Sequence, residues 1–245
     1  MFKKIVLMVF AVGIMHCLSG IAQANFVTLF SDNFNDNSLD TAKWTLLDKG
    51  GSSFYETNGS AQFTIYGSPD FNTNSIAIKS QTINAANNWT SVKFDTQWLI
   101  PYPVTAEYNF SVISGANSLK VAYSSWPYSQ ISIYDNADLI WRDTRPTPKT
   151  MTPVSFNINR TGQLELWENG VCVKALTDPK FSLMNSNSFQ VQLGGWDYSG
   201  YPNQTEYFDS VSFSANTPVP EPATMSLLGI GILGLIGLRK SYLSK

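Results

Sequence analysis

Side chains that could do nucleophilic or metal chemistry are scarce in this chain of 245 residues. It has one histidine, His16, and two cysteines, Cys17 and Cys172. His16 and Cys17 lie in an N-terminal leader that we expect to be removed, so the mature chain keeps Cys172 alone. A mature chain without histidine excludes Ser-His-Asp and Cys-His nucleophiles, and it excludes zinc sites built on imidazole. A single thiol also cannot form an intrachain disulfide.

Paired carboxylates are the remaining route to hydrolysis, because glycosidases place two of them about 5 Å or more apart across the bond that is cut. The closest pairs share a spacing of three residues and are Glu165 with Glu168, and Glu206 with Asp209. In a regular strand, side chains three residues apart point to opposite faces. Only the fold could join a distant pair such as Glu56 and Glu107. The sequence therefore favours a protein that is not an enzyme.

Aromatic residues indicate a different activity. Two segments share a Trp-x-Tyr-Ser core, and their aromatic residues are Trp126 with Tyr128, and Trp196 with Tyr198 and Tyr201. Rigid rings beside Asp, Asn and Ser suit carbohydrate, because the ring takes the CH face of a sugar while polar neighbours bind its hydroxyls. The alternative is that both tryptophans pack in the core or at its rim. We expect a carbohydrate-binding surface and keep that alternative open.

Both ends of the chain carry membrane signals. Met1 to Lys4 is basic, Ile5 to Leu18 is apolar, and Ala22-Gln23-Ala24 is a small-x-small site for signal peptidase. Residues 1–24 are therefore a predicted signal peptide. At the other end, the apolar stretch from Ala223 to Leu238 would span about 24 Å as a helix, close to the roughly 30 Å of a bilayer core. Arg239 and Lys240 follow it, which predicts a helix in the inner membrane with the bulk of the chain outside.

The region between these signals, residues 25–216, is long enough for one sizeable core. It keeps all the acidic residues except Glu221 and loses five of the basic ones to the two ends, which leaves a net charge near −6. No basic run or basic-aromatic patch occurs, so we expect no nucleic-acid partner. Alternation with period two predicts an antiparallel sandwich of short strands. These strands are expected at residues 62–66, 75–79, 92–98, 108–113, 119–123, 131–134, 156–158, 164–168, 171–176, 189–193 and 208–213.

One hairpin can be predicted in register, because Asn169-Gly170 suits a two-residue type I′ turn. The predicted pairs are Glu168 with Val171, Trp167 with Cys172, Leu166 with Val173, Glu165 with Lys174, and Leu164 with Ala175. This register places Leu164, Leu166, Val173 and Ala175 on the core face. It also predicts that Cys172 is a small packing residue beneath Trp167.

The C-terminal motif Pro220-Glu221-Pro222, with the apolar span and the basic cluster behind it, resembles the PEP-CTERM tail of exported Gram-negative proteins. In that family the tail is a sorting signal recognised by the membrane peptidase exosortase. The resemblance implies exosortase as a partner for residues 217–245. It also implies a membrane-anchored precursor that is sorted to the cell surface or extracellular matrix.

Three further segments resemble concanavalin A-like jelly rolls, including the laminin G-like members. They are the opening Phe30 to Trp44, the hairpin Leu164 to Val171, and the closing strand Glu206 to Phe213. The resemblance implies an all-β, two-sheet jelly roll whose closing strand lies beside the first. It also implies a structural Ca²⁺ held by Asp32 and Asp209, with Asp36 as a helper, although the same residues could simply form turns. The Glu-x-Asp-x-x-Glu strand of the laminarinase-like enzymes on this fold is absent.

The sequence as a whole predicts an exported, surface-directed jelly-roll domain that binds extracellular polysaccharide in an envelope or biofilm matrix. Two alternatives remain open. One is a structural surface protein with no small ligand, and the less favoured one is a β-glucan hydrolase.

Overall fold

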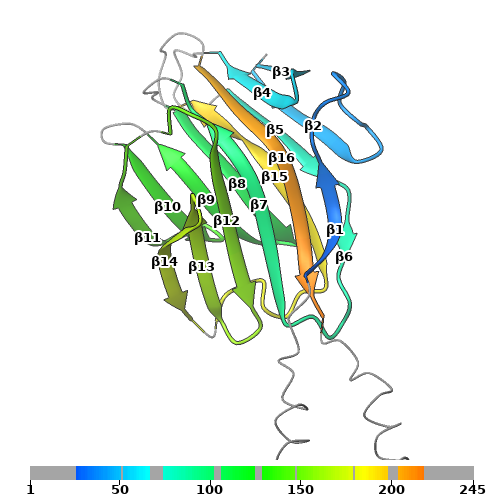
Figure 1. The fold of residues 1–245 in the computed structure, drawn as a ribbon, viewed down its shortest axis with the longest axis vertical. Helices are drawn as coiled ribbons and strands as arrows, with labels where there is room; N and C mark the ends of the chain where they lie inside the picture. Colours follow the sequence, from blue (N-terminus) through cyan, green and yellow to red (C-terminus); the bar gives the residue numbers. More distant parts are fainter. Residues whose placement is uncertain are drawn as a thin grey trace, which may run out of the picture. The chain divides into compact units, whose positions relative to one another are not determined.

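The computed structural model describes residues 26–50, 52–66, 74–101, 106–124, 129–146, 148–178, 180–197 and 204–217. Phe26–Asn216 form one compact unit (Figure 1). Among the described residues, no helix is long and apolar enough to cross a membrane. The predicted signal peptide with Ala22 and Ala24, the Pro220-Glu221-Pro222 motif, the apolar span and Arg239-Lys240 all lie outside the described residues.

The first sheet, here called sheet A, has strand order β14-β13-β12-β7-β16-β4-β3, and β1 also pairs with β16. Its strands are β1 (Phe26–Asp32), β3 (Ser53–Thr57), β4 (Ser60–Ile65), β7 (Ser91–Leu99), β12 (Thr152–Asn159), β13 (Gln163–Glu168), β14 (Val171–Thr177) and β16 (Gln204–Asn216). The long β16 lies between β7 and β1, as the orange strand in Figure 1 shows. The predicted pairing of the closing strand with the first is confirmed.

The second sheet, sheet B, has strand order β11-β10-β9-β8-β15-β5-β2, and β6 pairs with β15. Its strands are β2 (Trp44–Lys49), β5 (Ser75–Ser80), β6 (Ile83–Asn84), β8 (Ala106–Ser114), β9 (Asn117–Ser124), β10 (Gln130–Asp135), β11 (Asp138–Thr144) and β15 (Ser188–Asp197). All strand pairs within the described residues are antiparallel. The predicted all-β sandwich is confirmed.

Every strand predicted from alternation is present. The strands that alternation did not predict are β1, β2, β3, β6 and β11, and most of them lie at the edge of a sheet. An edge strand has less core to bury, so its sequence alternates weakly. In β2, for example, only Trp44 is buried and the five residues after it are exposed.

Aromatic rings join the two sheets. Phe94 of β7 stacks on Phe110 of β8, with ring centroids 5.0 Å apart. Phe156 of β12 lies 5.8 Å from both rings, and Trp98 meets the edge of Phe110 at 5.4 Å. Each of these four residues has no more than 1% of its surface exposed. Because these contacts come from the centre of both sheets, they fix which residues face inward and which face solvent.

The predicted hairpin register is right at the turn and wrong beyond it. Glu168 pairs with Val171 and Trp167 with Cys172, but a bulge then shifts the register by one residue. Lys174 consequently pairs with Leu166, and Glu165 pairs with Ala175.

The bulge also changes which side chains of β14 are covered. Leu164 and Leu166 are buried as predicted, but Val173 is only half-buried and Ala175 is exposed. Cys172 is exposed as well, so it is not the packing residue that we predicted. The physical reason is that β14 is the edge of sheet A, where one extra residue is accommodated easily.

Candidate functional site

The solvent-facing side of sheet B carries a polar row along β8. Tyr108 and Phe110 point into the core, so their neighbours Glu107, Asn109 and Ser111 point outward. These three polar side chains are nevertheless buried, with only 2%, 7% and 4% of their surfaces exposed. Polar side chains that point outward and are nevertheless buried indicate a depression in the face of the sheet.

Small residues form the floor of that depression. One register level runs across the sheet through Ala77 of β5, Gly194 of β15, Asn109 of β8, Ala122 of β9 and Ser132 of β10. All five are short, and they lie side by side on neighbouring strands. They therefore make a shallow channel perpendicular to the strands, which we call the sheet B trough.

Taller side chains flank the trough. Trp196 and Gln192 stand two residues on either side of Gly194, and both line a cavity of about 370 Å³ together with Asn109. Gly194 itself is sterically required. Its φ is 151°, and a Cβ there would lie 2.2 Å from the carbonyl oxygen of Ile76. Any other residue at position 194 would both distort the sheet and fill the trough.

An ion pair crosses the trough between β8 and β9. Lys120 Nζ is 2.6 Å from Glu107 Oε1 and 4.3 Å from the centre of the Tyr134 ring. Lys120 pairs across the strands with Ser111, whereas Glu107 pairs with Ser124. The two charged side chains therefore extend toward each other past the intervening Asn109–Ala122 pair. Their contact accounts for part of the burial of this row.

Among the predicted carbohydrate-binding residues, the structure describes only Trp196. It is half-buried and directly opposite Glu107 on the neighbouring strand. Its position at a solvent-facing cavity argues against the alternative that this residue packs in the core. Trp126, Tyr128, Tyr198 and Tyr201 lie outside the described residues.

Among the side chains that the structure describes, Glu107 has no second carboxylate beside it on β8. Glu107 is the acid of the row, and the next two outward positions on its strand hold Asn109 and Ser111. Glu56 pairs with the core residue Ala61 on the inward side of sheet A, so it does not share a face with Glu107.

Glu56 is instead paired with Asp36. Burial, and then a hydrogen bond to Asp36 and repulsion by that carboxylate, raise the pKa of Glu56 to about 8. The same hydrogen bond lowers the pKa of Asp36. Glu56 is therefore protonated at neutral pH while Asp36 is ionised.

The other two predicted acid pairs behave as strand geometry requires. Glu206 is 1% exposed and points inward beside Phe63, whereas Asp209 is half-buried and pairs with the outward Gln97. Both oxygens of Glu206 lack a hydrogen-bond partner, and burial raises the pKa of this carboxyl well above its usual value.

Glu165 and Glu168 likewise have different partners. Glu165 accepts a hydrogen bond from the indole of Trp167. Glu168 is 2.7 Å from the guanidinium of Arg145.

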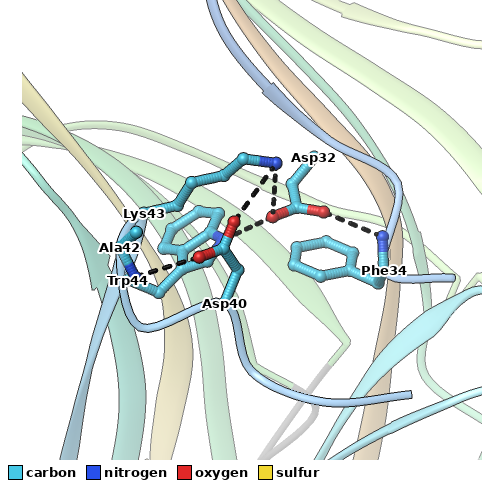
Figure 2. A network of polar contacts seen from close by, with 6 residues as sticks. All are labelled: Asp32, Phe34, Asp40, Ala42, Lys43 and Trp44. Carbon is cyan, nitrogen blue, oxygen red and sulfur yellow. Dashed lines mark hydrogen bonds and ion pairs between the residues drawn. The ribbon is translucent and has the colours of Figure 1, made fainter. Parts of the chain in front are cut away.

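Asp32, the first of the predicted calcium ligands, already has other partners (Figure 2). The Asp32 carboxylate accepts hydrogen bonds from the backbone N–H of Phe34 at 3.1 Å and from the indole of Trp44 at 2.8 Å. The ammonium group of Lys43 lies 3.5 Å from it, within reach of Asp40 as well. A cation therefore already sits beside Asp32.

Asp36 bonds Glu56, and Asp209 lies on β16 opposite Ser60. Within the described residues, no group of three or more acidic, cysteine or histidine side chains could hold a metal ion. Asp32, Asp36 and Asp209 do not fit the predicted Ca²⁺ site. Asp32 instead ties the opening loop to Trp44 at the start of β2.

Several residues of the trough were not predicted from the sequence. Alternation in the β8 segment was a usable signal, since it puts Glu107, Asn109 and Ser111 on one face. Nothing local could have placed Lys120, Gln192 or Gly194 beside them. Those positions follow from pairing between strands that are distant in sequence.

The chain can now be compared with known proteins. The family model described as "PEP-CTERM protein-sorting motif" matches residues 218–241. No curated protein matches the sequence.

Many solved structures share the fold. One is the catalytic domain of an endo-1,3-beta-glucanase (laminarinase) from Thermotoga petrophila, with a TM-score of 0.60 and 10% identity over 79% of this chain and 99% of that one. The endo-beta-1,3-glucanase of Pyrococcus furiosus gives 0.60 and 11% over 79% and 96%. A glycosyl hydrolase family 16 protein of Mycobacterium smegmatis gives 0.57 and 12% over 76% and 100%.

At such low identity these likenesses establish the fold alone. The sorting motif implies that the protein is exported, processed by exosortase and sorted to the cell surface. The chain therefore carries a PEP-CTERM sorting motif at its C-terminus, and its folded domain has the concanavalin A-like jelly-roll fold of the laminarinases.

Proposed function

We propose that this surface-sorted protein binds an extracellular polysaccharide in the sheet B trough and does not hydrolyse it. The observation that carries the proposal is the arrangement of Trp196 beside a floor of small residues that crosses neighbouring strands. A polymer lying across the strands can stack a sugar ring on Trp196. Asn109 and Gln192 lie within the same cavity and offer amide groups to its hydroxyls.

The arrangement of charges supports the proposal of binding without hydrolysis. A glycosidase needs an acid and a second carboxylate on one face. Glu107 has an amide and a hydroxyl at the next two outward positions, and its own charge is balanced by Lys120 at 2.6 Å. The laminarinase-like fold is thus retained here with a trough better equipped to hold a glycan than to cut it.

The test is retention on polysaccharides. The full chain, held in mild detergent, should bind at least one β-glucan or matrix polysaccharide on a broad glycan array. Trp196→Ala should weaken that binding by about tenfold, the loss expected for one aromatic contact of roughly 1.4 kcal/mol. Tyr55→Ala is the matched control, because Tyr55 is an aromatic residue 57% exposed on β3, away from the trough.

The alternatives give different results. A structural surface protein would bind nothing on the array above background. A hydrolase would release new reducing ends from β-glucans, and Glu107→Gln would stop that release. Equal retention of wild type and Trp196→Ala would remove Trp196 from the binding site.

A further inference from the structure

A cavity larger than that of the trough lies on the other side of the sandwich. It is a groove of about 880 Å³ over the outer face of sheet A. Its walls come from the end of β1 and from β16, β7, β12 and β13, which include the central strands of that sheet. A volume of this size is within the range of small-molecule sites. We call it the sheet A groove.

The floor of this groove is a second row of short polar side chains. One register level runs through Ser31, Ser212, Asp95 and Ser155, and it ends at Trp167. The Trp167 ring is held in place, because its indole N–H donates to Glu165 Oε2 at 3.2 Å and Gln163 donates to the other oxygen of Glu165 at 3.0 Å. The row thus offers hydroxyl groups along its length and a fixed aromatic ring at one end.

Four of the five charged side chains that line the groove form ion pairs, and the fifth, Glu165, accepts the hydrogen bonds from Trp167 and Gln163. Lys93 Nζ is 2.6 Å from Asp95, and Lys43 is 3.5 Å from Asp32. A charged ligand would have to break one of these contacts. A neutral ligand can use the hydroxyls and the ring without doing so.

One polar atom in the groove lacks a partner. Asn157 lies between Lys93 and Glu165 on the next register level and lines the cavity. Its side-chain oxygen is buried and accepts no hydrogen bond. A buried acceptor is stabilised by a donor, and a sugar hydroxyl is a neutral donor of the right kind.

We infer that the sheet A groove is a second carbohydrate site, for a neutral oligosaccharide segment that stacks on Trp167 and donates a hydroxyl to Asn157. The two sites face away from each other on opposite sheets of one domain. One molecule can therefore hold two separate polymer chains. This would make the protein a crosslinker of matrix polysaccharide, with an avidity that neither site has alone.

The test measures each groove separately. Neutral β-1,3-glucan and β-1,4-glucan oligosaccharides are titrated calorimetrically into the full chain in mild detergent. Trp196→Ala, which disables the sheet B trough, should keep one site. Adding Trp167→Ala should weaken that remaining site by about tenfold. Ser155→Arg, which fills the floor of the groove directly beside Trp167, should have the same effect on it. Tyr55→Ala is again the control.

Two results would overturn the inference. One is that the Trp196→Ala variant binds none of the neutral oligosaccharides. The other is that Trp167→Ala and Ser155→Arg leave its binding unchanged. Either result leaves the proposal for the sheet B trough standing, because glycan binding in the trough is measured separately, in the Trp167→Ala single variant.

Discussion

Glu206 makes the stability of this domain depend on pH. Its carboxyl group is 1% exposed and faces the core beside Phe63, and neither oxygen has a hydrogen-bond partner among the described residues. Ionising such a group in an apolar interior is costly, so burial raises its pKa well above 4.5. Folding at neutral pH therefore takes up a proton.

The sign of the effect follows from linkage. The folded state binds the proton of Glu206 more tightly than the unfolded state does. The contribution of this proton to the free energy of unfolding is therefore fully present below the unfolded pKa near 4.5. It is lost as the pH rises toward the folded pKa. Within that window, the free energy of unfolding should fall by about 1.4 kcal/mol per pH unit for this one group.

Glu206→Gln should remove that contribution, because the amide does not titrate. Wild type and variant should have similar stabilities near pH 5, and the variant should be more stable by about 2–3 kcal/mol at pH 7. The assay is urea unfolding at half-unit pH steps, followed by the fluorescence of the buried Trp44, Trp89 and Trp98.

Glu168→Gln is the matched control, since Glu168 pairs with Arg145 where solvent reaches both side chains. Its effect should stay under about 1 kcal/mol. Parallel stability profiles for wild type and Glu206→Gln between pH 5 and 7 would refute the reasoning. They would mean that the Glu206 carboxyl finds a partner or water when the protein is in solution.

Two further predictions concern the sheet B trough. Lys120→Met leaves the Glu107 carboxylate, 3% exposed, without its cation, so the domain should lose about 3 kcal/mol of unfolding free energy. The double variant with Glu107→Gln should recover most of it, and a double-mutant cycle in urea checks both values. Gly194→Ala should destabilise by about 2–3 kcal/mol because its Cβ would meet backbone at 2.2 Å. Gly59→Ala, with open space around it, should lose only about 1 kcal/mol, and equal losses in the two variants would contradict the close approach.

The sequence alone determined the class of fold. Alternating apolar residues in segments such as Val92 to Trp98 fixed both the strands and their inward faces, because period two has only one structural meaning over that length. The sorting motif at the C-terminus was predicted correctly as well, whereas the signal peptide stays a prediction. Basic, apolar and small-residue signals are read locally, so the sorting motif could be recognised without any fold.

The hairpin shows where local reasoning stops. Asn169-Gly170 correctly predicted the turn and the two pairs nearest to it. The bulge after Trp167 depends on β14 being an edge strand, and that is decided by the order of the whole sheet. Exposure of Cys172 follows from the same fact.

Only the tertiary structure decided what the polar residues do. Asp32 looked like a metal ligand, but Lys43 and Trp44 occupy its oxygens. The trough exists because β5, β15, β8 and β9 align in one register. The groove exists because β1, β16, β7 and β12 do so. The strands that align in each sheet are far apart in the sequence. Cross-strand register is a property of the assembled sheet, since each row takes a single residue from each strand. A linear pattern therefore cannot reveal it.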